Sequence, residues 1–201
     1  MESQSYYSNR RRIRANAHIR ELASSVYLNH KTFIQPLFVD ESIHTRTPIN
    51  SLHEVNSDTI DSMILQIESD IQSGVTKFLL FPVPLRKTEN NFDFSFVLKA
   101  LKTIRDNFGN TIWVAADLCL CAYTSHGHCG VLNEHKSAVL NDASVKIIAD
   151  YALQLVEAGA DCIAPSDMMD GRIQAIRTIL NTNGFDNKAI MSYSAKFSSQ
   201  F

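Results

Sequence analysis

Five short apolar runs alternate along the chain with amphipathic stretches, and this alternation constrains the fold more than any other feature. Each run is bounded by polar or breaker residues, which is typical of a buried strand. The predicted strands cover residues 33–39, 77–82, 112–116, 161–165 and 189–193. Apolar residues recur at helical spacing between them, which predicts helices over residues 59–73, 95–107, 144–158 and 171–183. Such alternation predicts an α/β fold with a parallel sheet.

The ends of two helices carry further signals. Asn141 or Asp142 is expected to cap the third helix, and Asp170 is expected to cap the fourth. Gly184 is expected to end the fourth helix.

Two architectures fit the alternation, an open doubly wound sheet and a (β/α)8 barrel. A glycine-rich phosphate loop does not follow the first strand, which disfavours the nucleotide-binding version of the open sheet. The chemically suggestive residues instead follow the third, fourth and fifth strands, where barrels place their active sites. A barrel has eight strands and typically about 250 residues. The sequence therefore predicts either an open sheet or an incomplete barrel.

The bulk composition excludes several classes of protein. The 201 residues are 45 % hydrophobic and carry a net charge of −2, which fits an ordinary globular protein without a nucleic-acid partner. The sequence lacks an apolar stretch of the roughly 18 residues that a membrane helix needs, and its N-terminus lacks the apolar core of a secretory signal. We therefore expect a cytoplasmic location, where the four cysteines are reduced and clustered ones are better interpreted as metal ligands.

Three of these cysteines form the pattern C-x-C-x7-C, at Cys119, Cys121 and Cys129. Thiolates are preferred zinc ligands, and three of them leave one position for water or substrate, as a catalytic zinc requires. From the spacing alone, a structural site completed by His126 or His128 is about as plausible, and so are three buried thiols without metal.

Further candidates follow the predicted strands. Asp117 can orient a ligand or move protons, although capping a turn is equally compatible with its position. Lys196, among small and apolar neighbours, can attack a carbonyl to form a Schiff base if its pKa is lowered, although a lone lysine is more often a surface charge. Ser166 and Asp167 can hydrogen-bond a polar ligand, and Arg172 can bind a carboxylate or simply solvate a helix start.

Taken together and in order, three segments resemble the porphobilinogen synthase (5-aminolevulinate dehydratase) family. The long matching segments cover residues 117–130, 157–171 and 191–197, and weaker matches cover residues 10–16, 34–39 and 81–85. The resemblance implies a (β/α)8 TIM barrel that condenses two molecules of 5-aminolevulinate into porphobilinogen and two waters, in tetrapyrrole (haem) biosynthesis. It also implies an N-terminal oligomerisation arm over residues 1–30, a catalytic barrel domain over residues 31–201, and a homo-octamer.

The resemblance assigns roles residue by residue. The three cysteines match the family's zinc ligands, which places the sequence in the zinc-cysteine type. Lys196 matches a Schiff-base lysine, and Asp117 matches a catalytic residue of the pocket. Ser166 and Tyr193 match residues that contact the substrate.

The sequence departs from the family at its C-terminus, because the family continues with three more barrel strands and a second Schiff-base lysine. Only about five βα units are present, so we expect these 201 residues, made alone, to bind metal weakly and to have little or no synthase activity. Two alternatives stay open: another Schiff-base barrel such as a class I aldolase, which needs Lys196 but not the cysteines, and a zinc-stabilised binding or regulatory module.

Overall fold

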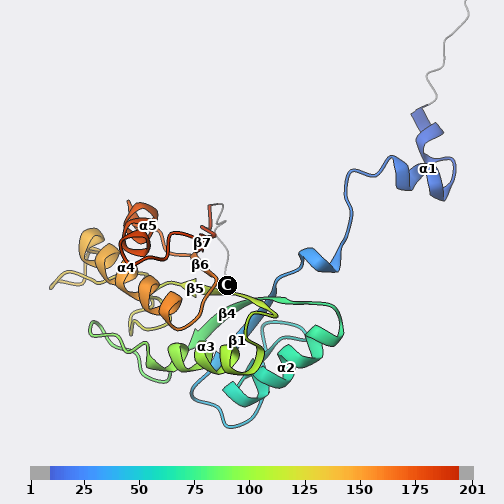
Figure 1. The fold of residues 1–201 in the computed structure, drawn as a ribbon. Coiled ribbons are helices and arrows are strands. Elements are labelled where there is room, and N and C mark those ends of the chain that lie inside the picture. Colours follow the sequence, from blue (N-terminus) through green and yellow to red (C-terminus); the bar gives the residue numbers. More distant parts are fainter. Residues whose placement is uncertain (1–9, 195–201) are drawn as a thin grey trace, which may run out of the picture. The chain divides into compact units, whose positions relative to one another are not determined.

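Parallel strands in chain order form the centre of the computed structural model, which describes residues 10–194 (Figure 1). The parallel strands that follow one another in the sheet are β1 (Gln35–Asp40), β4 (Lys77–Val83), β5 (Trp113–Leu118), β6 (Cys162–Pro165) and β7 (Ala189–Ile190). Each lies within one of the predicted strands or overlaps it to within two residues at the start. The five strand predictions are therefore confirmed as elements, although β7 is shorter than expected.

Two short strands extend the sheet beyond β1. β3 (Asn56–Asp58) pairs parallel with the end of β1, and β2 (Thr47–Pro48) pairs antiparallel with β3, so the sheet order is β2-β3-β1-β4-β5-β6-β7. Neither strand was predicted from the sequence. They are two and three residues long and largely polar, so they carry no apolar alternation.

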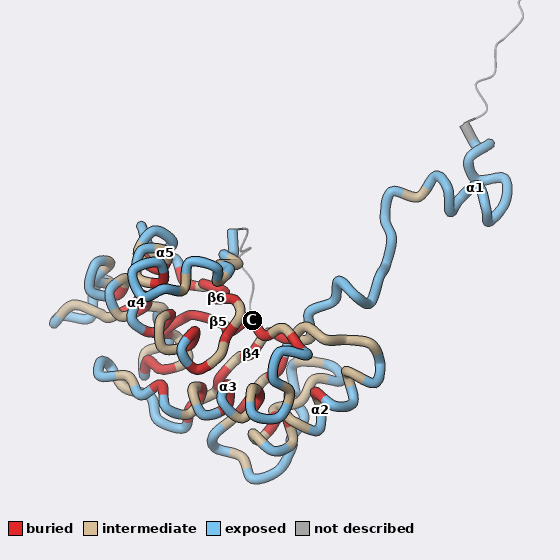
Figure 2. The backbone as a smooth tube through the Cα atoms, in the orientation of Figure 1, coloured by how far each residue is buried: buried red, intermediate tan, exposed pale blue. Residues whose placement is uncertain are grey.

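All four large helices pack against one face of this sheet. They are α2 (Ile60–Gln72), α3 (Ser95–Phe108), α4 (Asn141–Glu157) and α5 (Arg172–Thr182), and each contributes to one continuous buried apolar cluster. The strand residues in that cluster include Leu80, Ala116 and Ile163, which lie opposite one another in neighbouring strands. Figure 2 shows burial concentrated along the central strands. A doubly wound sheet carries helices on both faces and reverses its strand order, so sequential order with helices on one face indicates part of a barrel.

The opposite face of the sheet is the one that a barrel would enclose. Phe38 and Phe81 stack across β1 and β4 on this face, with ring centroids 5.1 Å apart. Asp117 alternates with the core residues Ala116 and Leu118 of β5, so it also belongs to this inner face.

The expected cap of α4 is wrong. The N-cap is Leu140, with no side-chain hydrogen bond to the helix. The Asn141 side chain instead bridges to a distant loop: its Oδ1 accepts from Asp170 N at 2.8 Å, and its Nδ2 donates to Asp170 O at 3.2 Å. A tertiary contact therefore occupies the amide that local rules assign to the cap.

The expected cap of α5 is also wrong, whereas its expected end is confirmed. Gly171, in a left-handed conformation with φ of 79°, is the N-cap in place of Asp170. At the other end Gly184 has φ of 80° and its N–H donates to Asn181 O at 3.2 Å, which is the role predicted for it.

The residues before the sheet form a separate unit, and the division between the two units falls between His30 and Lys31. In the described part, this unit has a 3-10 helix η1 (Arg10–Arg14) and the helix α1 (Ala17–Leu22), and a second 3-10 helix η2 (His30–Thr32) follows at the boundary. Asn16 caps α1 by accepting a hydrogen bond from Ile19 N at 3.0 Å. None of the helices formed by residues 10–194 has the length and apolar character that crossing a membrane requires.

Candidate metal centre

The loop that follows β5 brings the three predicted cysteines together. Cys119 is 4 % exposed, and Cys121 and Cys129 are half-buried. Their three Sγ atoms all lie within 4.8 Å of one another. A tetrahedral zinc with Zn–S distances of about 2.3 Å would hold its sulfurs about 3.8 Å apart. The triad therefore fits such an ion after a closing movement of about 1 Å or less.

The proximity of the thiols disfavours ionisation of the most buried one. Hydrogen bonds with the Cys121 and Cys129 thiols, together with burial, raise the pKa of Cys119 well above its ordinary value. A cation would reverse this preference, because metal ligation requires the thiolate form. The three cysteines can thus hold a metal ion, and within residues 10–194 neither His126 nor His128 joins their cluster.

Short backbone bonds shape the loop around the thiols. The turn begins where Tyr123 N and Thr124 N both donate to Leu120 O, at 2.9 and 3.0 Å. Thr124 Oγ1 then donates to His128 O at 2.8 Å, which draws the segment before Cys129 back toward the start of the loop. Cys119 precedes this turn and Cys121 lies inside it, so the turn itself, and not an extended C-x-C segment, brings the thiols together.

A neighbouring loop supports the same turn. Thr88 N donates to Tyr123 O at 2.8 Å, and Ser125 N donates to Thr88 O at 2.9 Å. The loop after β4 is therefore bonded to the loop after β5, as expected for adjacent strands of a parallel sheet.

The predicted residues of the neighbouring strands lie at the same edge. Ser166, directly after β6, donates its N–H to Leu118 O at 3.1 Å, which holds it beside the end of β5. Tyr193 N donates to Pro165 O at 3.1 Å, so backbone pairing with β6 continues beyond the assigned end of β7. Burial and the negative charge of Asp117 raise the pKa of the Tyr193 phenol. The structure thus gathers Cys119, Asp117, Ser166 and Tyr193 at one edge of the sheet, while Lys196 lies outside the described residues.

Asp167 and Arg172 bond to each other. Arg172 Nε lies 3.3 Å from Asp167 Oδ1, and Arg172 Nη1 donates to Met169 O at 3.0 Å. Asp167 Oδ1 also accepts from Met169 N at 2.8 Å. Arg172, whose side chain is 18 % exposed, thus pairs with a carboxylate of its own chain and shapes the turn between β6 and α5, and does not simply solvate the helix start.

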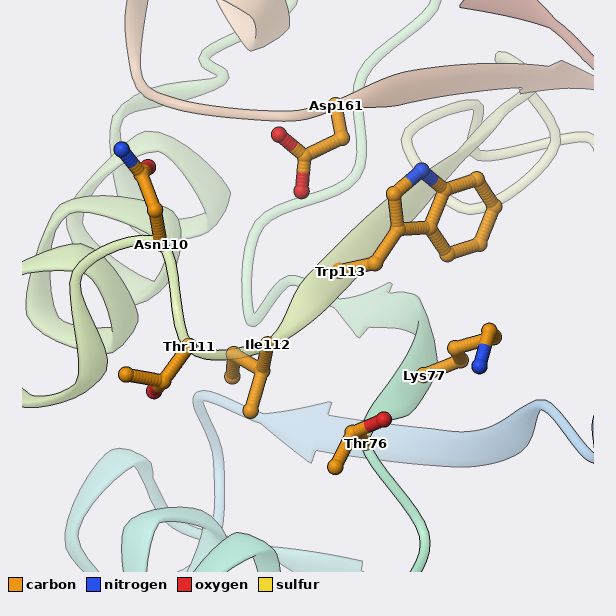
Figure 3. Close-up of a pocket in the computed structure, with 7 residues that line it drawn as sticks. All are labelled: Thr76, Lys77, Asn110, Thr111, Ile112, Trp113 and Asp161. Atoms are coloured by element: carbon orange, nitrogen blue, oxygen red, sulfur yellow. The ribbon is translucent and has the colours of Figure 1, made fainter. Parts of the chain in front are cut away.

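A hollow at the opposite edge of the sheet has a different character. It measures about 300 Å³ and is lined by Thr76, Lys77, Asn110, Thr111, Ile112, Trp113 and Asp161, which surround the starts of β4 and β5 (Figure 3). Asp161 accepts from Val114 N at 2.8 Å and pairs with Arg105. Polar groups at the amino ends of barrel strands usually serve stability, so the cysteine loop is the better candidate site.

Comparison with known proteins decides the family. The family model described as delta-aminolevulinic acid dehydratase matches residues 7–201. The chain belongs to the delta-aminolevulinic acid dehydratase family. The delta-aminolevulinic acid dehydratase of Methanothermus sociabilis is 39 % identical over 97 % of this chain and 61 % of its own length, and that of Bacillus subtilis is 36 % identical over 97 % and 60 %. The chain thus spans about 60 % of the length of these relatives.

A solved structure extends the similarity to the fold. The delta-aminolevulinic acid dehydratase (porphobilinogen synthase) of Toxoplasma gondii, crystallised with the reaction product porphobilinogen, superposes with a TM-score of 0.88 at 31 % identity, covering 96 % of this chain and 56 % of that chain. The predicted fold, part of an α/β TIM barrel, is confirmed.

Sequence reasoning missed the side chains that support the loop from behind. Tyr123, Tyr151, Phe94 and Ser144 are all buried next to it, and none was singled out. Only a weak signal was available: Ser144 and Tyr151 are seven residues apart and therefore share one helix face.

Proposed function

We propose that the protein is a porphobilinogen synthase, which condenses two molecules of 5-aminolevulinate to porphobilinogen and two waters. The proximity of the Cys119, Cys121 and Cys129 thiols at the carboxyl edge of the sheet is the observation that carries the proposal. Membership of the family and similarity to a structure that holds porphobilinogen support it.

We assign the three cysteines to a catalytic Zn²⁺. Thiolate donors suit zinc, and three protein ligands are typical of catalytic rather than structural sites. When bound, zinc would supply Lewis acidity toward a carbonyl or amine of the substrate.

The remaining roles belong to the chain's own side chains. Lys196 would attack the ketone of one substrate through its amine, releasing water and leaving that substrate attached as an imine beside the second. Asp117 would move protons at the reacting carbons. Ser166 and Tyr193, at the same edge of the sheet, would bind the substrate.

We also propose the division of labour along the chain that the family implies. Residues 1–30 would form an oligomerisation arm, residues 31–201 would belong to the catalytic barrel, and the assembly would be a homo-octamer. The cytoplasm is the compartment proposed, because the three cysteines, none of which forms a disulfide, need reducing conditions to ligate metal.

Metal removal tests the proposal in the protein expressed from its native gene. Chelation should abolish porphobilinogen formation while the circular dichroism spectrum persists, and added zinc should restore activity. Unfolding on chelation would instead indicate a structural metal, and activity that survives complete metal removal would refute the assignment.

Borohydride trapping tests the nucleophile separately. Reduction in the presence of 5-aminolevulinate should leave a stable adduct on Lys196, detected by peptide mass spectrometry. The Lys196→Met variant should form no adduct at that position. An unmodified Lys196 in active protein would contradict its role.

A further inference from the structure

Helix α4 lies behind the cysteine loop and bonds to it at two points. The two residues involved, Ser144 and Tyr151, are fully buried and seven residues apart. Seven residues make about two turns of helix, so both hydroxyls project from the same face of α4. Neither residue belongs to the cysteine triad that would ligate the metal, and no step proposed above uses them.

The first point is a pair of buried phenols. The Tyr123 and Tyr151 hydroxyl oxygens are 2.8 Å apart, within hydrogen-bond distance. Phe94 stacks on the Tyr151 ring at a centroid distance of 3.8 Å and meets the Tyr123 ring edge-on at 4.9 Å. Tyr123 is two residues from Cys121, so this aromatic cluster holds the first half of the loop.

The second point fixes the other end of the loop. Ser144 Oγ accepts from Val131 N at 2.9 Å and donates to Leu140 O at 2.7 Å. Gly130, next to Cys129, approaches so closely that an added Cβ would lie 2.5 Å from Ser144 Oγ. Ser144 therefore sets the position of the backbone that carries Cys129.

We propose that α4 positions the metal loop, with Tyr151 and Ser144 as positioning residues that set the metal affinity of the cysteine triad without touching the ion. The proposal rests on the metal site assigned under the proposed function. Three thiols on a loop must be ordered before they can ligate one ion, and ordering costs conformational entropy. A loop already bonded at both ends loses less on metal binding.

The test measures Co²⁺ and Zn²⁺ affinity by chelator competition, together with the thiolate-to-cobalt charge-transfer absorption, in the protein expressed from its native gene. Tyr151→Phe and Ser144→Ala should each weaken metal binding about tenfold or more, the range seen when a partner that orients a metal ligand is lost. The two anchors are separate, so their losses should multiply in the double variant.

A second double-mutant cycle tests the hydrogen bond between the Tyr123 and Tyr151 hydroxyls. Tyr123→Phe, Tyr151→Phe and the double variant all lack the same hydrogen bond, so the double variant should lose no more affinity than either single variant. Multiplying losses in this cycle would contradict a positioning role for the bond.

The matched control is Thr59→Ala, which removes the side-chain cap of α2 (Thr59 Oγ1 accepts from Ser62 N at 3.1 Å). Thr59 follows β3, which lies three strands from β5 in the sheet order. It should lower Tm and leave metal affinity and the cobalt spectrum unchanged. If the α4 variants behave like this control, losing Tm but not affinity, the positioning role is overturned and the metal site stands. If the unmodified protein shows no thiolate-to-cobalt absorption, the metal site and the positioning role both fail.

Discussion

The two edges of the parallel sheet use polar side chains in opposite ways. At the amino edge, Arg105 donates to Gly159 O at 2.6 Å and Gly109 O at 2.8 Å and pairs with Asp161, which Lys188 approaches to 3.8 Å. Opposite charges there neutralise each other within the protein. At the carboxyl edge, like groups gather instead.

Three thiols in contact at that edge raise the pKa of Cys119 and so resist forming thiolates on their own. Without a cation, the cluster of thiols contributes little to the stability of the fold. The arginine network, by contrast, already pairs opposite charges within the protein. The difference indicates that the amino edge stabilises the fold and that the carboxyl edge carries the chemistry.

The largest effect that distinguishes the edges should come from Cys129→Ser. Loss of one thiolate from three should weaken zinc binding by more than the roughly 100-fold that losing an orienting partner can cost, and should abolish porphobilinogen formation. Chelator competition and activity assays measure both. Cys162→Ser, which changes the buried cysteine outside the triad, is the control and should bind zinc normally. Equal zinc affinity in the two variants would show that the metal does not bind at the carboxyl edge.

Arg105→Ala should destabilise the fold through the amino edge and leave the metal site intact. Its side chain is 17 % exposed and that of Asp161 27 %, so the substitution leaves a largely buried carboxylate without its main partner and should lower the free energy of unfolding by about 3 kcal/mol. Urea denaturation measures this, and the metal affinity of the folded protein should not change. Lys136→Ala removes an exposed ion pair with Glu89 and should leave the midpoint nearly unchanged. A cobalt spectrum altered by Arg105→Ala would show that the edges are not separate.

Acidification should weaken metal binding at the carboxyl edge. The raised pKa of Cys119 means that the metal displaces at least one proton, so the affinity should fall by about tenfold or more for each pH unit lowered below neutrality. Competition titrations at two pH values, corrected for protonation of the chelator, measure the slope. A metal affinity independent of pH would contradict this, because it would indicate that the cysteines are already thiolates before the metal binds.

The smallest expected effect is a loss of stability in alkali. Burial raises the pKa of Cys162 from 9.0 to about 11. Between these values the unfolded chain loses the proton and the folded chain keeps it, so this stabilisation is complete below pH 9 and disappears as pH rises through 11. Urea midpoints at pH 8 and pH 10 should therefore differ more in the unmodified protein than in Cys162→Ala. Equal differences would assign the alkaline effect to other groups.

Local patterns in the sequence were sufficient for the large elements and for part of the site. Apolar spacing located α2 to α5 and the main strands because amphipathic periodicity directly reflects burial. The spacing of Cys119 and Cys121 predicted that their thiols lie close together, although a turn and not an extended segment holds them there. Position after the predicted strands already indicated Lys196 and Ser166, and recognition of the family gave them specific roles and added Tyr193. These roles stay predictions.

Only the tertiary structure decided between a barrel and a doubly wound sheet, because strand order and helix side are relations between segments distant in sequence. The same holds for Asn141, which bonds to Asp170 and does not cap α4, and for the position of Cys129 beside the other two thiols. The sequence by itself determined which residues could ligate a metal. The packing of Tyr151 and Ser144 behind the loop decided that those residues meet, because hydrogen bonds between a loop and a later helix form only once the chain has folded.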